Sequence, residues 1–133
     1  MKFLLLLPVL ALGACATESR PYNPVRDVRY SAIGADPFWQ LTIGDDRIVL
    51  RVAADPATGQ APPDAIWPRT LPRIQDGVTT WQSDSGTASI EIESRPGPCG
   101  SDQGPTWRDS VTVRLAGREL TGCGGPLVPR ARD

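Results

Sequence analysis

The stretch FWQLTIGDDRIVLRV, residues 38–52, decides the fold class of this chain. Residues 38–43 and 47–52 are rich in aromatic and β-branched side chains and alternate apolar with polar positions. This alternation is typical of a half-buried strand. Gly44, Asp45 and Asp46 lie between the two runs and favour a tight turn. We therefore predict an antiparallel hairpin here.

Five further segments carry strand character. They cover residues 29–33, 78–82, 87–93, 110–115 and 118–123. The chain also holds 13 Gly and 14 Pro among its 133 residues, a content that favours short strands and many turns over helices. We predict an all-β domain, a small antiparallel β-barrel or sandwich of about six to eight short strands.

Two long segments are predicted to be irregular. Residues 53–72 contain five prolines, and because proline lacks the ladder donor, a central strand there is improbable. A segment of this length is either a binding loop or a mobile excursion. Residues 94–109 are predicted to form a second loop.

The N-terminus has the pattern of an export signal. Lys2 precedes an apolar run, residues 3–12, which is shorter than the roughly 20 residues that cross a bilayer. The tetrad LGAC, residues 12–15, resembles a bacterial lipobox. That resemblance implies diacylglyceryl on the Cys15 sulfur, cleavage before Cys15 and a further acyl chain on the new N-terminus. The alternative is ordinary secretion with cleavage elsewhere.

These features predict four segments and a location. They are a lipoprotein signal peptide (1–14), a lipidated flexible tether (15–28), a β-domain (29–125) and a C-terminal tail (126–133). Two or more acyl chains give stable anchoring, so we expect a protein of the cell envelope. By resemblance to sorted lipoproteins, Ala16 after the cysteine favours the periplasmic face of the outer membrane.

Charge and composition exclude several classes of function. Once Lys2 is removed with the predicted signal peptide, the chain contains 13 Arg and 15 acidic residues. Its net charge is therefore slightly negative, and no basic surface field favours a nucleic-acid partner. Histidine is absent, which removes the commonest general base and metal ligand. No nucleophile–base pair, phosphate loop or ligand cluster is visible. We predict neither metal nor cofactor and no enzymatic activity.

Two cysteines, Cys99 and Cys123, remain after lipidation of Cys15. Disulfides persist outside the cytoplasm, and we predict one between these two residues. In the chain-entropy model such a bond is worth about 3–4 kcal/mol. The alternatives are a thiol nucleophile or half of a metal site, and neither has a histidine or a third free cysteine to support it.

Three motifs resemble a known group of proteins. GADPFW (34–39) is similar to the Gly-x-Glu-Pro-Phe-Trp opening of a family of uncharacterised bacterial envelope proteins, which also carry Gly-Pro-Cys and Leu-x-Gly-Cys, here 97–99 and 120–123. Asp36 replaces the usual glutamate, and residues 100–107 lack the usual Met-Ser-Asp and Tyr-Pro. The resemblance implies the fold and the disulfide but no activity. The chain is also loosely similar to META-type domains and to lipid-anchored lysozyme inhibitors.

The tryptophans are the candidate binding residues. Phe38 and Trp39 point to opposite faces of a strand; we interpret both as core residues, with an exposed Trp39 as a binding hot spot the alternative. Trp67 lies among prolines and Trp107 lies beside Cys99. Either could line a recognition surface or cap one end of a barrel.

Four arginines are weaker candidates. They are either scattered over the surface or converge on an anionic glycan or lipid head group: Arg69, Arg73, Arg95 and Arg108.

Three functions remain open at this point. The leading hypothesis is a non-catalytic binding or structural role in the envelope, with the membrane as partner through Cys15 and an envelope protein or glycan as a second partner. The alternative is inhibition of lysozyme or another cell-wall hydrolase. A second alternative is an enzyme of unknown type.

Overall fold

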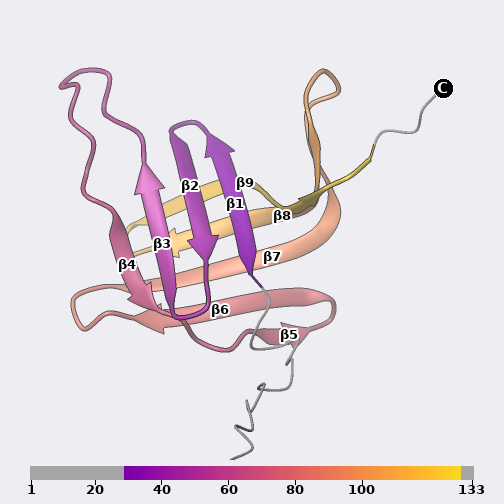
Figure 1. Cartoon of the computed structure of the whole chain (residues 1–133), viewed down its shortest axis with the longest axis horizontal. Coiled ribbons are helices and arrows are strands. Elements are labelled where there is room, and N and C mark those ends of the chain that lie inside the picture. Colours follow the sequence, from indigo (N-terminus) through magenta and orange to yellow (C-terminus); the bar gives the residue numbers. More distant parts are fainter. Residues whose placement is uncertain (1–28, 130–133) are drawn as a thin grey trace, which may run out of the picture.

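The computed structural model describes residues 29–129, and within them it forms one curled antiparallel sheet without a helix (Figure 1). The predicted all-β fold is confirmed. The predicted signal peptide, the predicted lipidation site Cys15 and the predicted tether lie outside the described residues. The strands are β1 (Tyr30–Ala35), β2 (Phe38–Ile43), β3 (Arg47–Val52), β4 (Ala65–Pro68), β5 (Arg73–Gln75), β6 (Val78–Asp84), β7 (Ser89–Gly100), β8 (Thr106–Leu115) and β9 (Arg118–Leu127).

The predicted hairpin is present as β2 and β3. Its register pairs Trp39 with Val52 and Ile43 with Ile48, and the turn is closed by a 2.9 Å hydrogen bond from the Gly44 amide to the Arg47 carbonyl. Because successive side chains alternate between the two faces of a strand, Trp39, Leu41 and Ile43 all point inward and are buried.

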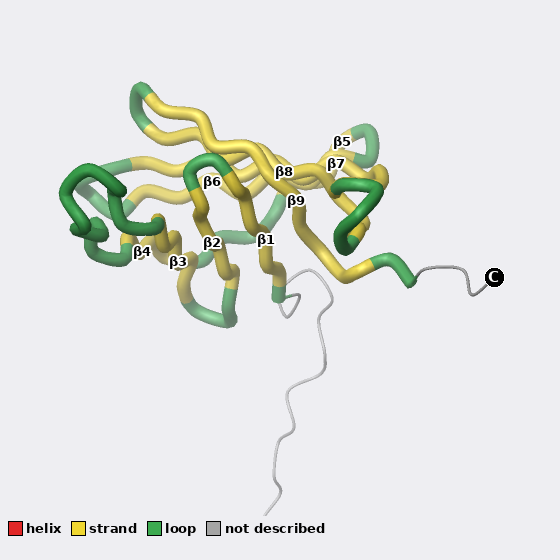
Figure 2. The backbone as a smooth tube through the Cα atoms, turned by 90° about the horizontal axis from the view of Figure 1, so that it is seen from above, coloured by secondary structure: helices red, strands yellow, loops and turns green. Residues whose placement is uncertain are grey.

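The order β4-β3-β2-β1-β9-β8-β7-β6-β5 places the first four strands beside the last five. β1–β3 run across the direction of β7–β9 (Figures 1 and 2), so the inner faces of the two halves enclose the core. Fourteen buried apolar residues form it: Tyr30, Ala32, Trp39, Leu41, Ile43, Ile48, Leu50, Trp67, Trp81, Ile90, Ile92, Val111, Val113 and Leu120.

Side chains bridge β4 to β6 and to the β6–β7 turn, although β4 and β6 are not neighbours in the sheet. The Trp67 indole N–H donates to the Ala88 carbonyl at 3.0 Å, and the Ser83 hydroxyl donates to the Pro68 carbonyl. Just beyond β4, the Thr70 hydroxyl donates to the Gln82 carbonyl at 2.7 Å. The half-barrel is therefore bridged here by side chain-to-backbone bonds.

The strand count and two boundaries differ from the prediction. Nine strands form, because two short strands were not predicted. β4 arises inside the proline-rich segment 53–72 and β5 directly after it. β4 lies at one end of the sheet order, where the missing ladder donor of Pro68 is tolerated. The predicted loop at 94–109 is wrong: β7 continues to Gly100 and β8 starts at Thr106. The predicted start of the tail at 126 is too early, since β9 runs to Leu127.

Two bulges explain why the β7–β8 region was hard to recognise. β7 advances three residues from Pro96 to Cys99 while β8 advances two, and β9 does the same between Gly124 and Leu127. An extra residue on one strand bends and twists the sheet locally. The bulges interrupt the strict alternation by which strands are recognised in a sequence.

The Cys99–Cys123 disulfide is present, as predicted. Its two strands, β7 and β9, are separated by β8, and strands that flank a third are roughly 9–10 Å apart in a flat sheet. The Cα atoms are nevertheless only 5.5 Å apart. The bulges on both sides of β8 bend the sheet at this point and bring the cysteines together.

Candidate functional site

One pocket combines apolar walls with buried polar groups. It lies between the β5–β6 hairpin and the beginning of β1, has a volume of about 470 Å³ and opens to solvent. Pockets of this volume are typical of small-molecule sites. We call it the β5 pocket. Its lining is Tyr30, Pro72, Ile74, Gly77, Thr79, Trp81, Ser94, Pro96, Arg108 and Asp109.

A chain of hydrogen bonds forms the polar wall of the β5 pocket. The Tyr30 hydroxyl donates to Asp109 Oδ2 at 2.9 Å and lies 2.8 Å from Ser94 Oγ. Because the single phenolic proton is directed to Asp109, the Ser94 hydroxyl is the donor to Tyr30. Arg108 donates to the same carboxylate from Nε at 3.0 Å and Nη2 at 2.9 Å.

These bonds fix the protonation states of the cluster. Burial by itself would raise the pKa of Asp109, but the hydrogen bonds from Arg108 and Tyr30 outweigh it and hold that pKa below its ordinary value. Burial raises the pKa of Tyr30 far above its ordinary value. At neutral pH the pocket therefore contains a carboxylate and a neutral phenol, with the Arg108 guanidinium paired to the carboxylate.

Glycines on β9 make room for this cluster. A Cβ at Gly124 would lie 2.7 Å from the Tyr30 hydroxyl, and one at Gly125 would lie 2.7 Å from Asp109 Oδ2. Both distances are closer than van der Waals contact. Gly125 also has a positive φ of 77°, a conformation that favours glycine. The bulge on β9 and the polar wall thus depend on the same residues.

Trp81 joins the pocket to the core. Its ring packs on Tyr30 with centroids 5.2 Å apart, and it is almost fully buried. Its indole N–H is buried with no acceptor among residues 29–129. A buried donor without a hydrogen-bond partner lowers the stability of the fold by about 1–3 kcal/mol. Trp81 is therefore an unusual residue to find in the wall of a pocket.

The three tryptophans predicted to form a binding surface do not come together as one. Trp39 and Trp67 are buried core residues whose indole N–H groups turn inward to bond the carbonyls of Thr121 and Ala88. The interpretation of Trp39 as a core residue therefore agrees with the structure, and neither indole is part of an exposed surface. Trp107 is half-buried beside the disulfide, opposite Cys99 in the register. The neighbour of Trp39, Phe38, is 53% exposed, so its interpretation as a core residue is wrong.

The four arginines do not converge. Arg108 belongs to the β5 pocket, whereas Arg73 and Arg95 line a separate depression formed by the other face of β5 and β6. The Arg69 amide donates to the Asp46 carbonyl at 3.0 Å, near the β2–β3 turn.

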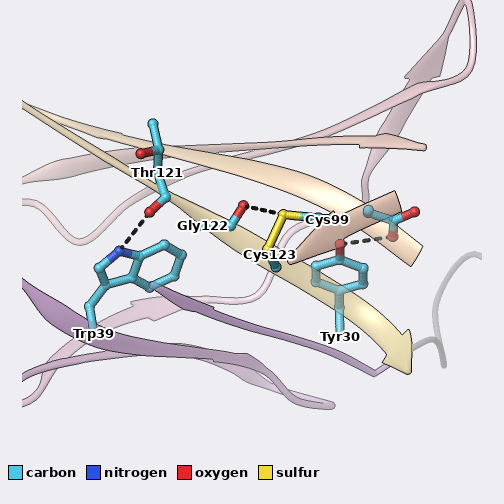
Figure 3. Close-up of a disulfide and its surroundings, with 7 residues drawn as sticks. Tyr30, Trp39, Cys99, Thr121, Gly122 and Cys123 are labelled. Carbon is cyan, nitrogen blue, oxygen red and sulfur yellow. Dashed lines mark hydrogen bonds between the residues drawn. A yellow bond between two sulfur atoms is a disulfide. The ribbon is translucent and has the colours of Figure 1, made fainter. Parts of the chain in front are cut away.

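The disulfide lies between the core and the pocket. In Figure 3 the bond stands between Trp39 on one side and Tyr30 on the other. Cys99 Sγ is 3.4 Å from the Gly122 carbonyl oxygen, a contact without a proton because the sulfur is oxidised. The disulfide therefore fixes β7 to β9 beside the polar wall.

Comparisons with known proteins give no match among family models, curated proteins or solved structures. Over residues 29–129 no group of three or more potential metal ligands occurs. In the same range no helix is long and apolar enough to cross a membrane.

Most of the pocket was missed by sequence reasoning. Among its residues only Arg108 had been singled out. Ser94 and Asp109 lie 64 and 79 positions after Tyr30 along the chain. The three residues meet only because of the order of the strands in the sheet. One sequence signal was available: Asp109 and Ser94 occupy inward positions in strands whose other inward residues are apolar.

Proposed function

We propose that this chain is a lipid-anchored lipoprotein of the cell envelope, facing the periplasm from the outer membrane, whose β-domain is a non-catalytic binding module. The binding site in this proposal is the β5 pocket. The observation that carries it is an open, largely apolar cavity of about 470 Å³ with a preformed polar wall. A cavity with mostly apolar walls and a few oriented polar groups is the usual form of a ligand site.

The chemistry of the polar wall supports binding rather than catalysis. Asp109 accepts three hydrogen bonds, from Tyr30 and twice from Arg108, and its lowered pKa makes it a weak base. The high pKa of Tyr30 likewise keeps the phenol from acting as a base at neutral pH. A general base needs a pKa near the working pH. The cluster instead holds one wall of the pocket rigid.

Photo-crosslinking in living cells tests the binding module. A photoreactive amino acid replaces Ile74, which lines the pocket and is 66% exposed. The matched control replaces Ile66 on β4, which is 51% exposed and does not line the pocket. We expect adducts, analysed by mass spectrometry, from position 74 and few from position 66.

The outcomes separate the candidate functions. A single envelope protein, lipid or glycan attached at position 74 supports the binding module, and a cell-wall hydrolase attached there supports the inhibitor alternative. Equal labelling at both positions, or none at either, contradicts a pocket-based function.

Anchoring has its own test. We expect Cys15→Ala to move the protein from the membrane fraction to the soluble fraction after cell lysis, since the acyl chains would be lost. Ser101→Ala, an exposed position far along the chain, serves as the control and stays with the membranes. Unchanged fractionation of Cys15→Ala would remove the lipid anchor from the proposal.

A further inference from the structure

We infer that the β5 pocket binds a single acyl chain of a lipid. This inference rests on the proposed binding function and names its ligand class. The argument uses three features of the described residues: the chemistry of the walls, the state of the polar groups, and the place where the chain enters the domain.

The walls and rim of the pocket expose apolar surface that nothing in the domain covers. Ile74 projects from β5 into the pocket opposite Thr79 in the register and is 66% exposed. Pro72 and Pro96 line the cavity beside it, and the neighbouring Leu71 is also exposed. Apolar surface of this kind gains free energy when an apolar ligand removes it from water.

The acceptors and hydroxyls of the polar wall are already occupied with one another. Ser94, Tyr30 and Asp109 form a continuous hydrogen-bonded chain, which leaves the buried Trp81 N–H and the outer donors of Arg108 as the polar groups for a ligand. A sugar would have to bury several hydroxyls against these few donors, and unpaired buried hydroxyls are costly. An acyl chain makes no such demand and fills the cavity by contact alone.

Arg108 stands where a lipid head group would lie. Its side chain is 58% exposed, and its bonds to Asp109 use Nε and one Nη2 proton. An arginine has five N–H donors, so others remain for a phosphate at the mouth of the pocket.

The pocket lies where the chain leaves the domain toward its proposed anchor. Tyr30 begins β1 and lines the pocket. The 14 residues from Cys15 to Val28 span at most about 50 Å when fully extended. A lipid on Cys15, or a lipid taken from the adjacent membrane, is therefore within reach of the pocket.

Fluorescence quenching tests this inference on the full-length Cys15→Ala chain. The probe is a lysophospholipid with bromine on its acyl chain, titrated below its micelle concentration, because bromine quenches a tryptophan that it touches. We expect saturable quenching that is largely lost in Trp81→Phe. Ile74→Asp would place a charge in the apolar cavity and should weaken binding about tenfold or more.

Ile66→Asp is the matched control, since it adds the same charge at an exposed isoleucine outside the pocket. It should bind like the parent, and both aspartate variants should keep the parent's unfolding midpoint. Absent quenching, or equal binding by the two variants, overturns the acyl-chain inference. If Ile74 crosslinks to a protein in cells while the lysophospholipid does not quench, this inference fails and the proposed binding module stands.

The wild-type lipidated chain identifies the source of the acyl chain. Reconstituted in unlabelled vesicles, it should resist quenching by the added probe if its own lipid fills the pocket. Quenching equal to that of Cys15→Ala assigns the site to a separate lipid. Both results support an acyl chain as the ligand.

Discussion

Trp39 and Tyr30 lie on either side of the disulfide, each over a glycine of β9, but their surroundings differ. Trp39 lies over Gly122 of β9, where a Cβ would come within 2.8 Å of its ring, and Tyr30 lies over Gly124, where a Cβ would come within 2.7 Å of its hydroxyl. On the Trp39 side the neighbours are apolar. On the Tyr30 side they are Ser94 and Asp109.

The difference shows that the same backbone feature, a glycine on β9 that makes room for an aromatic ring, occurs both in the apolar core and in the β5 pocket. In each case a glycine on β9 admits a ring from the opposite half of the sheet. The indole N–H of Trp39 needs only the Thr121 carbonyl, 3.3 Å away, and the rest of its environment is dry. The phenol of Tyr30 instead leads to a buried carboxylate whose charge is balanced by the exposed Arg108. Both rings belong to the buried core, but only the Tyr30 side also contains a buried charge.

The largest effect should come from the Trp39 side. Trp39→Ala removes a side chain that is 1% exposed and leaves a cavity, so we expect a loss of about 3–5 kcal/mol in the free energy of unfolding. Urea denaturation followed by circular dichroism measures it. Phe38→Ala, at the adjacent exposed ring, should cost less than about 1 kcal/mol. Similar losses for the two variants would refute the assignment of Trp39 to the core.

Removal of the disulfide should come next. The bond joins residues 24 positions apart, and the chain-entropy model gives about 3–4 kcal/mol for such a loop. The Cys99→Ala/Cys123→Ala double variant should show this loss in urea denaturation, and the reduced wild-type protein should lose a similar amount. A double variant as stable as the oxidised protein would show that the bulges hold β7 to β9 without the bond.

The smallest effect should come from the polar side and depend on pH. Asp109→Asn should cost about 1–3 kcal/mol at neutral pH, because the charge-assisted bonds from Arg108 are weakened. The folded-state pKa of Asp109 is lowered, so its contribution is complete above the unfolded pKa of about 4 and is lost as the pH falls through the folded value.

Urea denaturation at a series of pH values from neutral to strongly acid checks this dependence. The difference between wild type and Asp109→Asn should shrink below about pH 4. Exposed carboxylates with lowered pKa values, such as Asp64 and Asp84, remain in both proteins and cancel. A difference that stays constant down to acid pH would mean that Asp109 does not carry the charge assigned to it.

The strands that sequence reasoning recovered are those with local signals. The β2–β3 hairpin has its alternation and its turn within residues 38–52, so neighbouring positions suffice to define it. Cys99 and Cys123 could be paired because composition left no other partners once Cys15 was assigned to lipid. Trp39 was correctly interpreted as a core residue, but the burial of Trp67 depends on the β6–β7 turn that lies opposite its indole, and nothing near Trp67 in the sequence indicates it.

The remainder depended on non-local or irregular features. β4 is held by β3, by the bond from Trp67 to Ala88 in the β6–β7 turn and by the bond from Ser83 to Pro68, and these partners lie outside the proline-rich segment. The distal part of β7 is not recognisable as a strand because the bulge at Pro96 and Gly97 breaks its alternation. The pocket was missed for the same reason, because its walls come from five strands.

The two Gly-Pro steps, Gly97-Pro98 and Gly125-Pro126, occupy equivalent places on the two strands that flank β8. Each lies within a bulge that adds one residue to a strand beside β8. Deletion of Gly97 or Pro98 would shift Cys99 along β8, whereas Cys123 lies before the β9 bulge and would keep its place, so the two sulfurs would no longer meet. The β7 bulge and the disulfide are therefore expected to be kept or lost together.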